Sequence, residues 1–204
     1  MNTQEREIKL YIQDLPALAE RLRICGAELI HERVLERNIR LDTADHSLER
    51  GGRLLRLRKD ARARVTYKDN AVFEDGVVSR TELEFEVDDF EMAWRLFEAL
   101  GFRVAARYEK YRREYQLGDV LVMLDELPFG NFVEIEAANN ILIDGMVQML
   151  GLDGSRGIAT NYLGLMHIVK ERLELPFEDL TFENFAGLTV APSDLGVEPA
   201  DASG

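Results

Sequence analysis

The N-terminal stretch of the chain carries two carboxylates and one amine at alternate positions, Glu5, Glu7 and Lys9. Side chains two residues apart in a β-strand point to the same face, so this spacing predicts that the three charges share one face. Grouped carboxylates suit a hard divalent cation, and a nearby lysine suits an anion. A charged strand face more often means only that this face lies in solvent. Whether the pattern recurs decides between the two interpretations.

The same alternation recurs in later segments, with charged residues on one face and apolar residues on the other. In residues 80–87, for example, Leu83 and Phe85 alternate with acidic side chains. If the set of Glu5, Glu7 and Lys9 is counted as the first, basic side chains dominate the second to fourth sets, and acidic side chains dominate the first, fifth and last. The further charged sets are Glu36, Asn38 and Arg40; Arg56 and Arg58; Arg64, Thr66 and Lys68; Arg80, Glu82, Glu84 and Glu86; Lys110, Arg112 and Glu114; Asp125; and Glu134 with Glu136.

Eight strand candidates result, and eight strands close a barrel whose interior holds side chains or one small ligand. We therefore expect an α+β fold, a closed eight-stranded barrel with the charged sets inside and helices packed outside. Inward bases require a polyanion and clustered carboxylates require a hard cation, which together describe a metal-bound polyphosphate. The alternative is a dry barrel lined by salt bridges, which would have to satisfy many buried charges without a ligand.

Composition narrows the class of protein. The chain has 204 residues, is 46% hydrophobic and carries a formal charge of -13, which argues against a general nucleic-acid surface. A single cysteine, Cys25, excludes an intramolecular disulfide and suits a reducing compartment. We expect no membrane span and no signal peptide, and hence a cytoplasmic location, because apolar runs are short and residues 1–9 are highly charged.

Helices are predicted between the strands at residues 14–26, 88–101, 140–150 and 159–173. Asp14 before Pro16 is typical of a helix start, and Gly26 of a helix end. The resulting order is β-α-β-β-β-β-α-β-β-β-α-α. Residues 1–173 are expected to form one domain. Residues 174–204 are expected to form an acidic C-terminal extension that is partly disordered, above all in its last dozen residues.

Taken together and in order, the charged motifs resemble those of the CYTH superfamily, the triphosphate tunnel metalloenzymes, over roughly residues 1–172. The resemblance implies an eight-stranded antiparallel tunnel that binds a triphosphate beside a divalent metal, as in class IV adenylyl cyclases, thiamine triphosphatases, inorganic triphosphatases and RNA 5′-triphosphatases. The motifs are Glu5-x-Glu7-x-Lys9, Asn38 before Asp42-Thr43, Leu55-Arg56-Leu57-Arg58, Thr66-Tyr67-Lys68, Arg80-x-Glu82-x-Glu84, Lys110-x-Arg112, Asp125-Glu126 and Glu134-x-Glu136.

The resemblance implies three sets of site residues. Those expected to grip phosphate are Lys9, Arg40, Arg56, Arg58, Lys68, Arg80, Lys110 and Arg112. Those expected to hold Mg²⁺ or Mn²⁺ are Glu5, Glu7, Asp125, Glu134 and Glu136. Those expected to take part in catalysis are Glu5, Glu7, Lys9, Glu82 and Glu84. Within the last two sets, Glu82, Glu84 and Asp125 are alternatively expected to hold a second ion, position water or orient the bases.

Two positions depart from the family pattern. Lys68-Asp69-Asn70 stands where the family often has Lys-Gly-Pro, and Arg40 stands where an aromatic residue is common. Tyr162 resembles a family tyrosine near a helix that plugs the tunnel, and it is equally compatible with simple helix packing.

The expected function is hydrolysis of the terminal phosphate of tripolyphosphate, thiamine triphosphate or a nucleoside triphosphate by a metal-dependent enzyme. One alternative is a class IV adenylyl cyclase, and a second is a non-catalytic module that binds polyphosphate or nucleotide. An apolar barrel rim or the fourth helix would support a homodimer.

Overall fold

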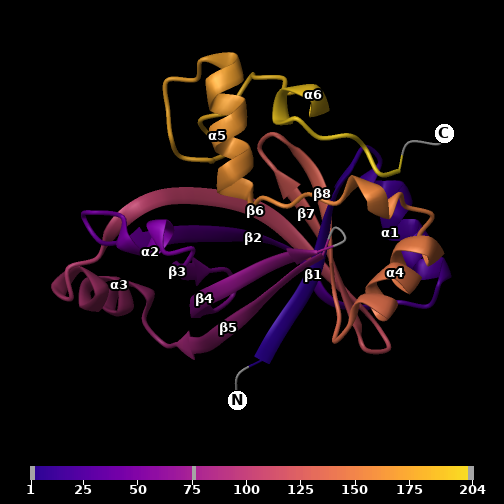
Figure 1. Cartoon of the computed structure of the whole chain (residues 1–204), viewed down its shortest axis with the longest axis horizontal. Coiled ribbons are helices and arrows are strands. Elements are labelled where there is room, and N and C mark those ends of the chain that lie inside the picture. Colours follow the sequence, from indigo (N-terminus) through magenta and orange to yellow (C-terminus); the bar gives the residue numbers. More distant parts are fainter. Residues whose placement is uncertain (1–2, 75–76, 202–204) are drawn as a thin grey trace.

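The computed structural model describes residues 3–74 and 77–201, and within them all side chains except those of residues 3–5, 70 and 74. Its strands are β1 (Thr3–Ile12), β2 (Glu28–Asp42), β3 (Leu54–Lys59), β4 (Ala63–Glu74), β5 (Val77–Val87), β6 (Arg103–Leu117), β7 (Val120–Leu127) and β8 (Gly130–Glu136). They close into a barrel in the order β1-β5-β4-β3-β2-β6-β7-β8 (Figure 1). Neighbouring strands run antiparallel all the way round, which confirms the expected fold.

The helices are α1 (Leu15–Ile24), α2 (Ser47–Arg50), α3 (Phe90–Ala99), α4 (Asn140–Met149), α5 (Tyr162–Leu173) and α6 (Pro192–Leu195), with a 3₁₀ turn, η1, at Gly154–Arg156. The expected caps are present, since the side chain of Asp14 accepts the backbone N–H of Ala17. Helix α5 begins three residues later than predicted because Asn161 caps it. The short helices α2 and α6 were not predicted, since four residues carry no helical period.

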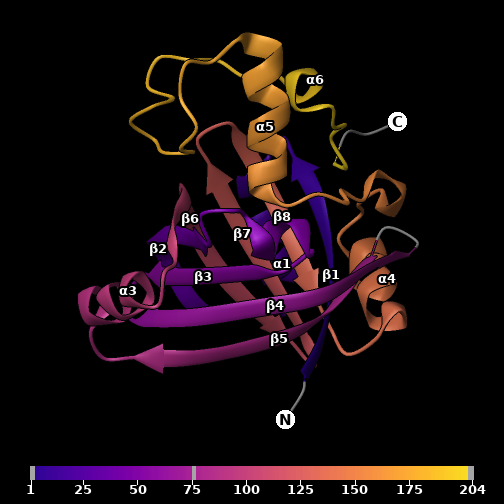
Figure 2. The same ribbon diagram turned by 60° about the vertical axis from the view of Figure 1, so that its left-hand side comes forward.

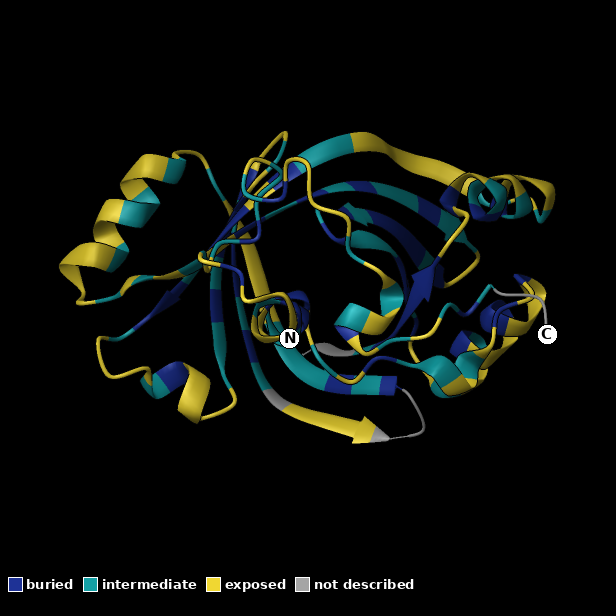
Figure 3. Cartoon of the chain, turned by 90° about the horizontal axis from the view of Figure 1, so that it is seen from above, coloured by how far each residue is buried: buried dark blue, intermediate teal, exposed yellow. Residues whose placement is uncertain are grey.

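Two apolar cores cover the outside of the barrel. On one side, α1 and α4 pack over the outer faces of β1, β7 and β8, with Leu18 and Ile143 fully buried between them. On the other side, α3 lies over β2, β3 and β4, where Leu57 is fully buried. Figure 3 shows that α3 itself stays half-buried or exposed along its length, in keeping with its lack of buried residues. The apolar sets therefore face outward, as the alternation predicted.

Residues 174–201 fold against the barrel rather than forming the partly disordered extension that we expected. Leu175, Leu180 and Phe185 are buried in a cluster with α5. Leu180 also pairs with β6 beside Tyr108, and Asp201 accepts the backbone N–H of Gln13. Figures 1 and 2 show α5 and α6 together above the barrel. This order was not predicted, because the apolar residues of this segment do not recur at the period of a helix or of a strand. The domain boundary at residue 173 stays a prediction.

Within the described ranges, no helix is long and apolar enough to cross a membrane. The longest, α5, has 12 residues.

Candidate functional site

Two adjoining cavities, of about 680 Å³ and 760 Å³, occupy the barrel interior and one of its mouths. They share several lining residues, including Lys9, Arg40 and Lys68, so they form one continuous space. The first cavity lies among the charged faces of the strands. The second opens at the surface between the α2 turn and α5, where His46 and His167 are exposed. We call these the inner cavity and the outer cavity.

Most of the predicted site residues line the inner cavity. They are Glu7, Lys9, Arg40, Arg56, Arg58, Lys68, Arg80, Glu82, Glu84, Lys110, Arg112, Glu134 and Glu136. The backbone of Glu5 pairs with Arg80, but its side chain lies outside the described residues. Asp125 is fully buried behind the cavity wall. Strand alternation thus brings the predicted set together, while the individual roles of these residues stay predictions.

One wall of the inner cavity, formed by β1 and β8, is acidic. The register places Glu7 opposite Glu136 and Lys9 opposite Glu134. Glu7 accepts a hydrogen bond from Arg80 at 2.7 Å, and Lys9 lies 3.2 Å from Glu134. Burial acts to raise the pKa of Glu134, but Lys9, Arg112 and Lys110 together hold that pKa well below its usual value. Glu134 is therefore charged and held by cations.

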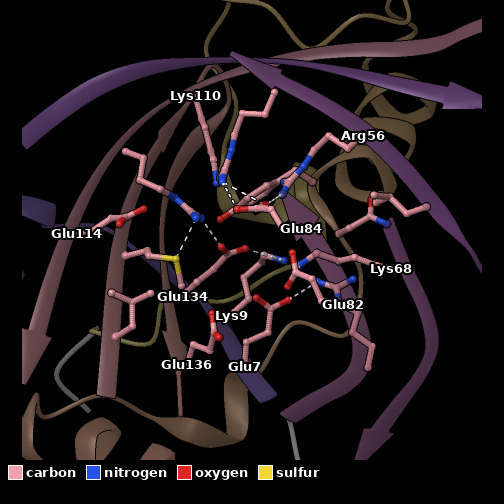
Figure 4. A pocket seen from close by; sticks show the side chains of 18 of the residues that line it. Glu7, Lys9, Arg56, Lys68, Glu82, Glu84, Lys110, Glu114, Glu134 and Glu136 are labelled. Atoms are coloured by element: carbon pink, nitrogen blue, oxygen red, sulfur yellow. Dashed lines mark hydrogen bonds and ion pairs between the residues drawn. The ribbon is translucent and has the colours of Figure 1, made fainter. Parts of the chain in front are cut away.

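The opposite wall, formed by β2, β3 and β6, is basic (Figure 4). The guanidinium of Arg58 donates to Glu36 at 3.3 Å and to Glu84 at 3.2 Å. Arg56 donates to the Tyr108 hydroxyl at 3.2 Å. Burial acts to raise the pKa of Glu36, yet the surrounding bases, Lys110 first, lower it to about 2. Glu36 therefore stays ionised and neutralises part of this wall.

Asp125 is hydrogen-bonded to two bases of this wall. Its carboxylate accepts hydrogen bonds from Lys110 at 2.9 Å, from Arg112 at 2.6 Å, and from the Tyr162 hydroxyl at 2.8 Å. A buried carboxylate with three donors has little capacity left for a metal ion. Of the alternatives for Asp125, the geometry favours orientation of the bases over a ligand role.

Tyr162 combines both interpretations that the sequence left open. It packs in the cluster under α5, with its ring edge against Phe132 at 5.2 Å between centroids. It also lines the inner cavity, where Lys9 Nζ lies 4.5 Å from its ring centroid. Tyr162 is thus both part of the α5 packing and part of the cavity wall.

Several buried polar atoms of the basic wall have no hydrogen-bond partner among the described residues. They are both amide atoms of Asn38, Oε2 of Glu36, and Nε of Arg56 and of Arg58. Asn38 is 2% exposed and stands across the strands from Arg58 and Tyr108. Because buried polar groups are nearly always paired, this wall is suited to a polar ligand or ordered water.

The predicted site residues did not include Arg64, Tyr108, Glu114 and Asp119, which line the inner cavity, or Glu36, which is buried beside Arg58. Glu36, Arg64 and Glu114 lay on the predicted charged faces, so the alternation already pointed to them. Tyr108 was missed because β6 begins seven residues before the predicted segment. Arg113 faces outward as expected, near the Tyr115 hydroxyl at 3.5 Å.

The carboxylate oxygens of the acidic wall are suitable ligands for a divalent cation. Glu7 and Glu136 provide carboxylate oxygens from adjacent strands, which Mg²⁺ and Mn²⁺ prefer. A separate group lies at the outer cavity, where potential ligand atoms of Asp42, His46 and Glu49 lie within 4.8 Å of one another. Asp42, however, already accepts the backbone N–H groups of Leu48 and Glu49, so its carboxylate stabilises the N-terminus of α2.

A family model described as the CYTH domain matches residues 3–140. The chain belongs to the CYTH family. The family resemblance drawn from the charged motifs is thereby confirmed. A protein of Methanocaldococcus jannaschii, provisionally named adenylate cyclase, is 29% identical over 134 residues, which cover 65% of this chain and 75% of the relative.

Solved structures extend the likeness of this CYTH chain to the whole barrel. A provisionally named adenylate cyclase from Vibrio parahaemolyticus has a TM-score of 0.71 at 19% identity, covering 79% of this chain and 97% of the other. A provisionally named adenylyl cyclase from Hippeastrum has a TM-score of 0.61 at 16% identity, covering 95% and 100%. At these identities the likeness concerns the fold.

Proposed function

We propose that this CYTH chain is a divalent-metal-dependent triphosphatase, which binds a triphosphate in the barrel and hydrolyses its terminal phosphate. The observation that carries the proposal is the separation of charge inside one cavity. In Figure 4, Lys110 and Arg56 lie across the cavity from Glu7 and Glu136. A phosphate chain against the basic wall would bring its oxygens within reach of a cation on the acidic wall.

The basic wall would bind the phosphate chain through Arg56, Arg58, Lys110 and Arg112, with Lys9, Lys68, Arg80 and Arg40 around them. Arginines offer paired donors to phosphate oxygens, and lysines act as point charges. Asp125 and Glu84 already hold the side chains of Arg112 and Arg58 by hydrogen bonds. Because these cations are pre-positioned, little reorganisation is needed when the ligand binds.

The acidic wall would hold Mg²⁺ or Mn²⁺ through Glu7 and Glu136, with Glu5 on the same predicted strand face. Glu134 is less suited as a ligand because Lys9 and Arg112 already engage its carboxylate. The bound ion would supply charge neutralisation at phosphate oxygens and lower the pKa of a bound water. We assign Glu82 and Glu84 to positioning, since Glu82 lies 3.2 Å from Lys68 and Glu84 accepts from Arg58.

An adenylyl cyclase is the second candidate, because the same walls would also hold the triphosphate of ATP. The reacting group would then be the ribose 3′-hydroxyl, which attacks the α-phosphate and releases pyrophosphate. The Hippeastrum protein of similar fold carries a cyclase name and a dominant triphosphatase activity, so a cyclase name alone does not favour cyclisation. We favour hydrolysis, which needs only water in place of a positioned ribose.

Product analysis tests this proposal. The protein is incubated with tripolyphosphate, thiamine triphosphate, ATP or GTP plus Mg²⁺ or Mn²⁺, and phosphate, pyrophosphate and cyclic nucleotide are quantified. We expect phosphate from at least one substrate and no cyclic nucleotide. Cyclic AMP with pyrophosphate from ATP would establish the cyclase instead. Binding without any product would indicate the non-catalytic module.

A further inference from the structure

Asn38 lies at the centre of the basic wall, on the inward face of β2 between Glu36 and Arg40. It stands opposite Arg58 of β3 on one side and opposite Tyr108 of β6 on the other. Side chains directly opposite each other have Cβ atoms about 4.5–5.5 Å apart, so the amide lies beside Arg58. The side chain of Asn38 is not among those that line the inner cavity, which places it behind its basic neighbours.

The amide of Asn38 is buried without a protein partner. Asn38 is 2% exposed, and neither the oxygen nor the nitrogen of its side chain has a hydrogen-bond partner among the described residues. Burial of an amide without hydrogen bonds is unfavourable, whereas burial of an apolar side chain of similar size is favourable. Packing of the barrel alone therefore does not explain an asparagine at this position.

Three neighbouring polar atoms also lack a hydrogen-bond partner among the described residues. They are Nε of Arg56, Nε of Arg58 and Oε2 of Glu36, although Lys110 lies 3.6 Å from the last. Arg58 is directly opposite Asn38, and Arg56 is the diagonal neighbour on the same strand. A buried water molecule accepts and donates up to two hydrogen bonds each way. It would accept both Nε–H groups and donate to the carboxylate and to the amide oxygen.

We propose that Asn38 is a positioning residue, which holds an ordered water against the Nε–H groups of Arg56 and Arg58 and so directs both guanidinium groups toward the inner cavity. The inference rests on the proposed function and deepens it. All four terminal nitrogens of these guanidinium groups already donate to protein side chains, and each carries a second N–H for a ligand. Nε is therefore the position at which a water supports them without competing with the substrate.

The space left at residue 38 distinguishes this role from simple packing. Asn38→Leu fills the space with apolar atoms and excludes the water, while Asn38→Ala leaves room in which water can still bind. The proposal therefore predicts that the leucine variant binds substrate more weakly than the alanine variant. A side chain that only filled space would give the opposite order, because alanine leaves a cavity in the packing. Asn38→Ser keeps a hydroxyl that can bond the water and should stay closest to the wild type.

The test measures kcat and KM for tripolyphosphate with Mg²⁺, for the wild type, the three Asn38 variants and Asn131→Leu. Asn131 is the matched control, since it is half-buried on β8 and lines neither cavity. Asn38→Leu should raise KM about tenfold, the scale of one hydrogen bond to a charged group. Its kcat should change less than KM, because the support acts on the bound substrate and on the transition state alike. Asn131→Leu should keep the wild-type KM.

A KM for Asn38→Leu within about twofold of the wild-type value overturns the inference. It is also overturned if Asn38→Ala raises KM more than Asn38→Leu does, or if only kcat falls, as a smaller folded fraction would cause. If Asn38→Leu does not fold, Asn38→Ser and Asn38→Ala carry the test, and equal KM values for these two overturn the inference. In each case a wild type that hydrolyses tripolyphosphate leaves the proposed function intact. A wild type that neither hydrolyses tripolyphosphate nor gains melting temperature from it with Mg²⁺ refutes the proposed function itself.

Discussion

The Tyr162 hydroxyl, at the start of α5, donates a hydrogen bond to Oδ2 of Asp125 on β7 at 2.8 Å. The same carboxylate holds Lys110 and Arg112. A helix that follows the family-matched residues 3–140 thus helps to position the basic wall of the cavity.

Removing this hydroxyl tests the link. Tyr162→Phe leaves a buried acceptor on Asp125 with one donor fewer, which should cost about 1–2 kcal/mol of unfolding free energy. It should also weaken tripolyphosphate binding, because Lys110 and Arg112 lose part of their support. Urea unfolding and calorimetric titration measure the two effects. Tyr115→Phe, on the outer face of β6, is the control and should leave affinity unchanged. Equal affinities for Tyr162→Phe and wild type would disprove the link.

Asp125→Asn should lower the free energy of unfolding far more than Tyr162→Phe does. It removes the charge that balances Lys110 and Arg112, which are 2% and 7% exposed. Breaking a buried ion pair on one side typically costs about 3–5 kcal/mol. The control, Asp119→Asn in the exposed turn before β7, should change stability by less than about 0.5 kcal/mol. If the unfolding free energy of Asp125→Asn lies within about 1 kcal/mol of the wild-type value, the ion pairs of Asp125 contribute less to stability than we infer.

Strand alternation accounts for how much of the site the sequence predicted. A period of two assigns each side chain to a face without knowledge of strand order, so Arg56 and Glu134 could be placed in the same interior. Pairing within that interior needs the register and the barrel order. For that reason the sequence could not tell that Asp125 serves the bases or that Glu36 neutralises Arg58. The order of residues 174–201 was missed because it depends on tertiary packing of Leu180 and Phe185 rather than on a period.

Glu36 should contribute a pH dependence of stability. Its pKa falls from 4.5 to about 2 in the folded chain, so the folded state binds its proton less readily than the unfolded state. The stabilisation is therefore complete above pH 4.5 and lost as the pH falls toward 2. The shift corresponds to about 3 kcal/mol. Urea unfolding between pH 6 and pH 2 should show Glu36→Gln losing about 3 kcal/mol less than the wild type. Identical slopes for the two proteins would rule out the assigned ion pairs of Glu36.

Neighbouring residues on β3 separate the inner face of the barrel from the outer face. Leu57 is fully buried in the core under α3, and Arg58 lines the inner cavity. Leu57→Ala should cost about 2–5 kcal/mol of stability, while the folded protein keeps its affinity for tripolyphosphate. Arg58→Ala should instead weaken tripolyphosphate binding strongly and Mn²⁺ binding without substrate hardly at all. Titration calorimetry measures both affinities, and the reverse pattern would contradict the assignment of the two faces.

The most direct measurement of the central claim is phosphate release from tripolyphosphate as a function of Mg²⁺ concentration, for the wild type, Glu7→Gln and Glu91→Gln. Glu7 lines the acidic wall, whereas Glu91 is exposed on α3. We expect Mg²⁺-dependent release by the wild type and Glu91→Gln, and a loss greater than tenfold, or about 1.4 kcal/mol, for the folded Glu7→Gln. Release that persists in EDTA, or a Glu7→Gln rate above about a tenth of the wild-type rate, would contradict the metal site on the acidic wall.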